Sequence, residues 1–182
     1  LVSFPAFVGM GVIASPLVNL IPRYQKWLPA LIPLYLYLIN AAWATISTPL
    51  TNALNAIGKI KTTFKLMVMW TVLTWGLMPF LAIRYGFLGV AFSAALISTS
   101  SIIVLFIVYR IVKVNFVTAL ATPTIATLAM GISLFLIRPY LVSLNLVFGS
   151  ILFGAFIYFL SLYFLEGKKL FTQIHSLFKP NV

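Results

Sequence analysis

The chain has no cysteine and only one acidic residue, Glu166. The absence of cysteine excludes disulfides and thiolate metal sites. With one carboxylate and one histidine, His175, the chain cannot assemble a pair of catalytic carboxylates or a Ser-His-Asp triad. Glycine-rich phosphate loops are absent as well. These absences predict that the chain is not an enzyme and holds no metal and no cofactor.

Charged residues of any kind are scarce. They make up 7% of the 182 residues, whereas 63% are hydrophobic and the mean hydropathy is +1.14. A soluble domain carries about 25% charged residues, so water is not the main solvent of this chain. The net charge of +11 would suggest nucleic acid in a soluble protein, but the basic residues fall in short gaps between apolar runs. We therefore expect membrane lipids, and no nucleic acid, as partners.

Long apolar runs are what the sequence has in abundance. A helix needs about 20 apolar residues to cross the hydrocarbon core of a bilayer. Six runs of about this length occur, over residues 1–21, 27–47, 66–83, 87–109, 116–137 and 144–165. They predict an all-α, polytopic membrane domain of about six transmembrane helices over 1–165. Residues 166–182 follow as a cytoplasmic amphipathic tail with apolar residues at helical spacing.

The basic residues predict the orientation of these helices, because lysine and arginine are retained on the cytoplasmic side. If successive gaps alternate between the two sides, eight basic residues fall on one side and four on the other. The eight are Lys59, Lys61, Lys65, Arg110, Lys113, Lys168, Lys169 and Lys179, and the four are Arg23, Lys26, Arg84 and Arg138. This count predicts a multi-pass protein of the cell membrane with both chain ends in the cytoplasm.

A stripe of polar residues recurs at spacings of three and four, which keeps it on one helical face. Its members are Asn40, Trp43, Ser47, Thr51 and Asn55. An unpartnered amide is costly in hydrocarbon, so this face should point toward another helix or a water-filled cavity. Two interpretations of this stripe stay open: its residues form hydrogen bonds between helices, or they line a path for a sugar. Residues 98–101 add hydroxyls that can bond their own helix backbone.

A basic cluster, Lys59, Lys61 and Lys65, follows this stripe closely. Lysines bind phosphate as point charges, so a pyrophosphate head group is one ligand for Lys59 and Lys61. Anchoring of the helices at the cytoplasmic surface is the other reading.

Small residues form a further pattern at helical spacing. They are Gly86, Gly89 and Ser93 in one span and Gly149 and Gly154 in another. Such spacing lets helices approach closely. We interpret these residues as helix-packing positions, with sliding of helices during transport as the alternative.

Three short motifs occur in a recognisable order. They are SPLVNLI at 15–21, NALNAIGK at 52–59 and YGFLGVA at 85–91, with KWLPA at 26–30 between the first two. Together they resemble the polysaccharide transporter family of the multidrug/oligosaccharidyl-lipid/polysaccharide flippase superfamily, over roughly residues 6–97. In that family, turns like those at 54–59 and 85–91 bracket one helix.

The resemblance implies a two-lobe fold that moves a polyprenyl-linked oligosaccharide from the cytoplasmic to the outer leaflet by alternating access. Leu1 lies inside an apolar run, so the chain is expected to be the C-terminal part of such a protein, partnered by a missing N-terminal lobe. A multidrug exporter of the same superfamily and a non-transporting membrane scaffold are the alternatives. The lack of buried acids argues against the exporter.

Overall fold

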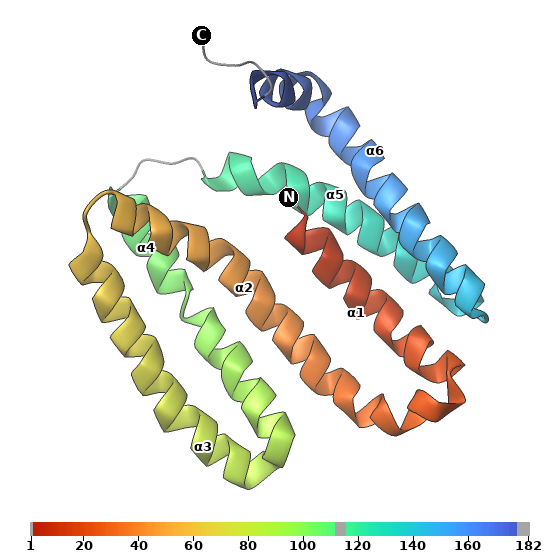
Figure 1. Cartoon of the computed structure of the whole chain (residues 1–182), viewed down its shortest axis with the longest axis horizontal. Coiled ribbons are helices and arrows are strands. Elements are labelled where there is room, and N and C mark those ends of the chain that lie inside the picture. Colours follow the sequence, from red (N-terminus) through yellow and green to blue (C-terminus); the bar gives the residue numbers. More distant parts are fainter. Residues whose placement is uncertain (1, 112–115, 178–182) are drawn as a thin grey trace. The chain divides into compact units, whose positions relative to one another are not determined.

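The computed structural model of the chain describes residues 2–111 and 116–177, and these contain helices and no β-strand. Figure 1 shows the elements along the chain. They are α1 (Ser3–Leu20), the 3-10 helix η1 (Pro22–Ala30), α2 (Leu31–Ala56), α3 (Ile60–Thr99), α4 (Ile102–Ile111), α5 (Phe116–Ile137), the 3-10 helix η2 (Arg138–Tyr140) and α6 (Leu144–Leu177). The predicted all-α fold class is confirmed.

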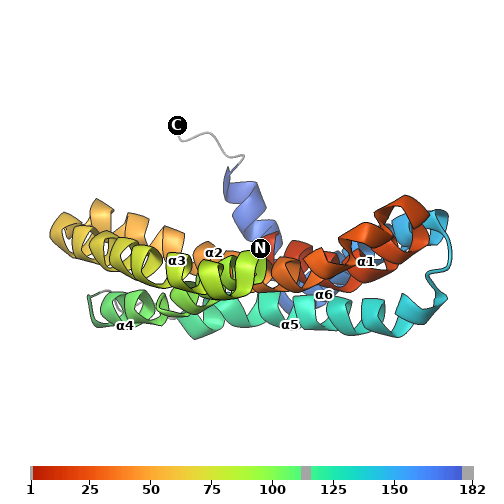
Figure 2. The same ribbon diagram turned by 90° about the horizontal axis from the view of Figure 1, so that it is seen from below.

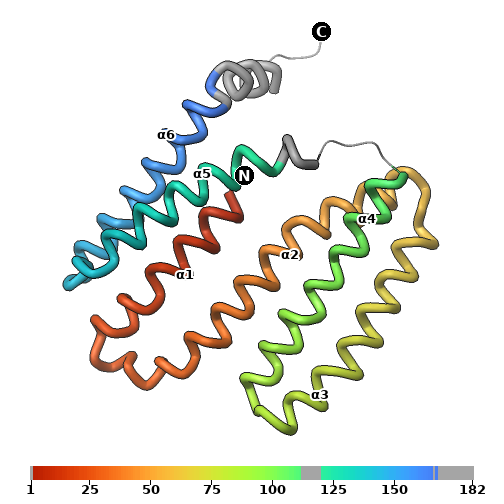
Figure 3. The backbone as a smooth tube through the Cα atoms, turned by 180° about the vertical axis from the view of Figure 1, so that it is seen from behind, coloured from red at the N-terminus to blue at the C-terminus, as the bar shows by residue number. Residues whose placement is uncertain are grey.

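Five helical stretches of the described residues are long and apolar enough to cross a membrane, whereas six spans were predicted. The difference arises in the stretch Ile60–Ile111, which is 52 residues long and contains both predicted spans 66–83 and 87–109. Gly86 has non-helical backbone angles, φ 58° and ψ −138°, where two helices meet at a kink. Figure 3 shows that α3 turns back on itself. The stretch therefore consists of a first arm of α3, residues 60–85, and an antiparallel second arm, residues 87–99, which α4 follows.

The helices divide into two compact units, although the sequence predicted one domain over 1–165. The first unit contains α1, α5, η2 and α6, and the second contains η1, α2, α3 and α4. Each unit has buried side chains of its own.

In the second unit, α2 and α3 pack against each other and are joined by a tight turn at 57–59. Gly58 takes the positive φ of 76° that this turn requires and that glycine adopts without strain. Figure 2 shows α4 to one side of the layer that α2 and α3 form. Leu54, Leu66, Val104 and Val108, from three helical segments, are all at most 4% exposed and make the apolar centre of this unit.

The predicted span 27–47 differs from the observed helix at both ends. Its start lies in η1, and α2 continues to Ala56 with Pro49 inside it. Leu50 and Leu54, one helical turn apart on the same face just beyond Pro49, are buried. Packing against neighbouring helices therefore keeps the helix going past the proline.

The turn between the two arms of α3 depends on two glycines. Gly86 has the positive φ that side-chain-bearing residues rarely adopt. A Cβ at Gly89 would overlap the carbonyl group of Leu81 and would lie 3.1 Å from the nitrogen of Ala82. Only a residue without a side chain lets the second arm return this close to the backbone of the first.

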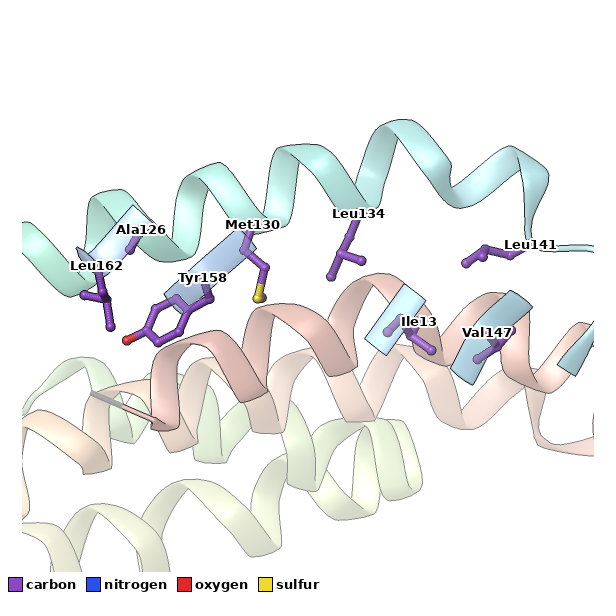
Figure 4. Close-up of a cluster of buried hydrophobic side chains, with 8 residues drawn as sticks. All are labelled: Ile13, Ala126, Met130, Leu134, Leu141, Val147, Tyr158 and Leu162. Atoms are coloured by element: carbon purple, nitrogen blue, oxygen red, sulfur yellow. The ribbon is translucent and has the colours of Figure 1, made fainter. Parts of the chain in front are cut away.

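In the first unit, α5 packs against both α1 and α6. Figure 4 shows its buried cluster, in which the side chains converge from the three helices. The members are Ile13, Ala126, Met130, Leu134, Leu141, Val147, Tyr158 and Leu162. Two glycines mark the closest approaches: a Cβ at Gly131 would lie 2.7 Å from Val8 Cγ1, and one at Gly154 would lie 3.1 Å from Leu134 Cδ1.

The predicted tail 166–182 is continuous with the last span. Helix α6 runs without interruption to Leu177, and residues 178–182, including Lys179, lie outside the described residues, as does Lys113. The side chains of Glu166, Lys168, Lys169 and His175 are likewise outside what the structure describes.

The glycine contacts generate a stability prediction. Gly89→Ala is expected to lower the free energy of unfolding by about 1–3 kcal/mol, because the added methyl forces the two arms of α3 apart. Gly149→Ala is the matched control, since a Cβ there meets nothing within 4 Å and alanine favours helix. Thermal unfolding in detergent, followed by circular dichroism, measures both. Equal midpoints for the two variants would contradict the antiparallel packing at Gly89.

Candidate functional site

The helix formed by the second arm of α3 and α4 is interrupted at residues 97–101. The backbone amides of Ser100 and Ser101 donate to the carbonyl oxygens of Ile97 (3.0 Å) and Ser98 (2.9 Å), three residues back. An α-helix uses the carbonyl four residues back, so the backbone tightens here into a 3-10 turn. Figure 1 shows the break between the end of α3 and the start of α4.

Hydroxyl groups explain why the helix breaks at this point. Ser98 Oγ and Thr99 Oγ1 both donate to the Ala95 carbonyl, at 2.8 and 3.0 Å, and Ser100 Oγ donates to the Ile97 carbonyl at 2.6 Å. Side-chain donors of this kind compete with backbone amides for the same carbonyls. Consecutive hydroxyl residues therefore offer the backbone an alternative to the regular helical ladder.

Two neighbouring segments send polar groups to the break and to the helical turn just before it. Asn40 Nδ2, from α2, donates to the Ala94 carbonyl at 3.0 Å in that preceding turn. Trp70 Nε1, from the first arm of α3, donates to Ser100 Oγ at 3.0 Å. We call residues 94–101 together with Asn40 and Trp70 the polar break. Three helical segments meet in it through hydrogen bonds.

The position of the polar break within an apolar stretch makes it a candidate for a functional site. It lies near the middle of the apolar stretch 87–109, and Ser98 and Ser101 are 8% and 5% exposed. Non-helical backbone at membrane depth is tolerated only where protein buries it or where it lines a water-filled cavity. Discontinuous helices of this kind form the substrate sites of many transporters. The polar break is therefore the candidate site of this chain.

The structure divides the predicted polar stripe of α2. Asn40 takes part in the polar break. Ser47 and Thr51 are buried, and Thr51 Oγ1 donates to the carbonyls of Ser47 (3.1 Å) and Thr48 (2.9 Å) within α2. Asn55 is exposed near the end of the helix. The stripe thus faces the interior of its unit over 40–51 and reaches the surface only at Asn55.

The predicted basic cluster lies away from the polar break, beside the turn at 57–59. Lys59 and Lys61 are exposed there, and so is Lys65. One turn into α3, Thr63 is 2% exposed, and its hydroxyl has no hydrogen-bond partner within the described part of the chain. The lysines are free to meet an anion from outside, but the structure does not bring them together with Asn40.

The five predicted packing positions behave differently from one another. Gly89 and Gly154 lie in close contacts between helices, and Ser93 is fully buried, with its hydroxyl donating to the Val90 carbonyl at 2.8 Å. Gly86 serves the turn, and no atom comes within 4 Å of a Cβ placed there or at Gly149. At Gly149 no neighbouring helix among the described residues requires glycine.

Sequence reasoning did not single out Trp70. The signal that could have found it is pairing about the turn at Gly86, because an antiparallel pair centred on 85–86 sets residue 70 opposite residue 100. The hydroxyl of Ser100 can accept a hydrogen bond as well as donate one. The indole N–H of Trp70 can only donate, so the two groups are suited to pair.

Comparisons with protein-family models, with curated protein sequences and with solved structures found no match to this chain.

The bond between Trp70 and Ser100 can be measured by a double-mutant cycle. Trp70→Phe and Ser100→Ala are each expected to destabilise the chain, and the double variant less than their sum, with a coupling energy of about 0.6 kcal/mol. Trp75→Phe, at a 77% exposed position of the same arm, is the control and should show no coupling to Ser100. Additivity of the Trp70 and Ser100 effects in detergent unfolding would show that the bond does not form.

Proposed function

We propose that this chain is the C-terminal part of a membrane transporter that passes a lipid-linked oligosaccharide across the cell membrane by alternating access. The observation that supports it is the polar break, an interrupted helix within an apolar stretch with polar groups from two neighbouring segments directed at it. The resemblance of residues 6–97 to polysaccharide transporters indicates the substrate class. Transport is thus inferred from the polar break, and the substrate class is inferred separately from the sequence resemblance.

The chemistry of the polar break suits a sugar. An amide, an indole N–H and several hydroxyls meet there, and all of them are neutral. Sugar hydroxyls both donate and accept, so they can take the place of the internal hydrogen bonds when the helices separate. Neutral groups exchange partners at lower cost than ion pairs do in an apolar medium. The site is therefore suited to a substrate that must be released again.

The basic cluster supplies a second contact for such a substrate. Lys59 and Lys61 are exposed, and the one carboxylate of the chain, Glu166, is far from them in sequence. A polyprenyl-linked sugar carries phosphate between lipid and sugar, and lysine attracts phosphate as a point charge. Lys59 and Lys61 would hold that phosphate at the cytoplasmic surface while the sugar moves.

The fold of the second unit is compatible with the proposed orientation. Its alternating helices place Lys59, Lys61, Lys65 and Arg110 at one end and Arg23, Lys26 and Arg84 at the other. Three of these cations lie over aromatic rings of their own helices: Arg110 at 4.4 Å from the Phe106 centroid, Arg84 at 5.0 Å from Phe80 and Lys26 at 5.7 Å from Trp27. Such pairs suit the ends of membrane helices, where an apolar stem ends in a charged group.

Transport is tested by complementation with the complete gene in a strain that lacks its lipid-linked oligosaccharide flippase. Asn40→Ala and Trp70→Phe are expected to lower the transport rate about 5–10-fold at unchanged abundance in the membrane, which corresponds to about 1–1.4 kcal/mol. Trp75→Phe should retain the full rate. Full activity of both polar-break variants would remove the site, and failure of the wild-type gene to restore transport would favour the scaffold alternative.

Orientation is tested by labelling, which the absence of native cysteine makes simple. A single cysteine at Tyr85, which is 61% exposed at the turn of α3, should react with an impermeant maleimide in intact cells. A single cysteine at Lys61 should react only after the cells are permeabilised. The reverse pattern would invert the proposed topology.

A further inference from the structure

The segment η1 is unusual in its backbone and in its exposure. It forms a 3-10 helix of nine residues, although such helices rarely exceed three or four. None of its residues is buried. Its contacts within its unit are with α2, and they leave the side chains of η1 available to another surface.

The 3-10 geometry sorts the side chains of η1 into ridges. With three residues per turn, side chains three positions apart eclipse one another. Tyr24 and Trp27 therefore form an aromatic ridge, and Arg23 and Lys26 form a cationic ridge beside it. Tyr24 and Trp27 are 47% and 56% exposed, and Lys26 Nζ lies 5.7 Å from the centre of the Trp27 ring. The two ridges thus touch along one edge.

The place of η1 in the chain sets these ridges at a membrane surface. The segment follows the candidate span Ser3–Leu20 and forms the first nine residues of the next candidate span, Pro22–Ala56, which continues as α2. Tyr and Trp are enriched at the level of lipid head groups, where one side of the ring meets hydrocarbon and the other meets water. An aromatic ridge at the end of two spans fits that level.

The cationic ridge selects among lipids. Arg23 and Lys26 carry two of the twelve positive charges, and Glu166 is the only carboxylate in the sequence that could neutralise any of them. A surface rich in anionic head groups attracts each such cation. We propose that η1 is a binding element for anionic phospholipids, with Tyr24 and Trp27 inserted at head-group depth and Arg23 and Lys26 bound to lipid phosphates. This holds whether or not the chain transports an oligosaccharide.

The test places one fluorophore on η1 and asks which lipid lies beside it. A single cysteine at Gln25, exposed and on neither ridge, is labelled in the otherwise cysteine-free chain, and the protein is reconstituted in phosphatidylcholine vesicles. Brominated phosphatidylglycerol should quench this probe about two- to fivefold more than brominated phosphatidylcholine at equal mole fraction. A probe at Val72, 64% exposed within the first arm of α3, should be quenched equally by both lipids.

The charge variants assign the selectivity to the cationic ridge. Arg23→Gln with Lys26→Gln should abolish the excess quenching by phosphatidylglycerol, and raised salt should reduce it. Arg84→Gln with Arg138→Gln removes the same amount of charge from the same predicted side and should leave the excess unchanged. Equal quenching of the Gln25 probe by the two lipids in the wild-type background, or an excess that survives Arg23→Gln with Lys26→Gln, would overturn the proposal. The comparison of the two brominated lipids in the wild-type background tests the proposal even if a charge variant fails to fold.

Discussion

The structure depends on one constraint: in an apolar medium, every backbone amide and carbonyl needs a partner inside the protein. Long helices meet this constraint, and the described residues are almost entirely helical. The places where the helices stop are therefore the informative ones. They include the turn at Gly58, the reversal at Gly86, the 3-10 segment η1 and the break at 97–101. Glycine conformations serve the first two, and 3-10 geometry serves the other two, with hydroxyl donors added at 97–101.

The break at 97–101 lies near the middle of the apolar stretch 87–109, and neighbouring segments contribute Trp70 to it and Asn40 to the turn before it. Helix association in lipid has little hydrophobic driving force and relies on packing and on hydrogen bonds between helices. Asn40 and Trp70 therefore have two roles. They stabilise the second unit, and they place hydrogen-bond donors that can change partners beside an interrupted helix. Bonds of this strength suit the transport proposed above, since stronger ones would resist the separation of helices that admits a substrate.

Much of the fold could be predicted from the sequence, because hydropathy over about 20 residues reports directly on a membrane helix. The spans 116–137 and 144–165 match the limits of α5 and the apolar part of α6 closely. The predicted span 27–47 does not match the limits of α2, which begins at Leu31 and continues past Pro49 to Ala56 because buried Leu50 and Leu54 hold the helix together. The polar stripe identified Asn40, but spacing alone could not tell an inward-facing hydroxyl such as Thr51 from a cavity lining. That distinction depends on which helices are neighbours, and the periodicity of one helix carries no information about its neighbours.

The central proposal is that the helices open at the backbone of 97–101 during transport. Hydrogen exchange of the complete protein in lipid nanodiscs, resolved to single amides by mass spectrometry, tests it most directly. The account predicts that the amides of Ser100 and Ser101 exchange faster than those of Ser93 and Val108 on either side, and that lipid-linked oligosaccharide slows them. Protection at 97–101 equal to that of the flanking helix, unchanged by the substrate, would contradict the claim.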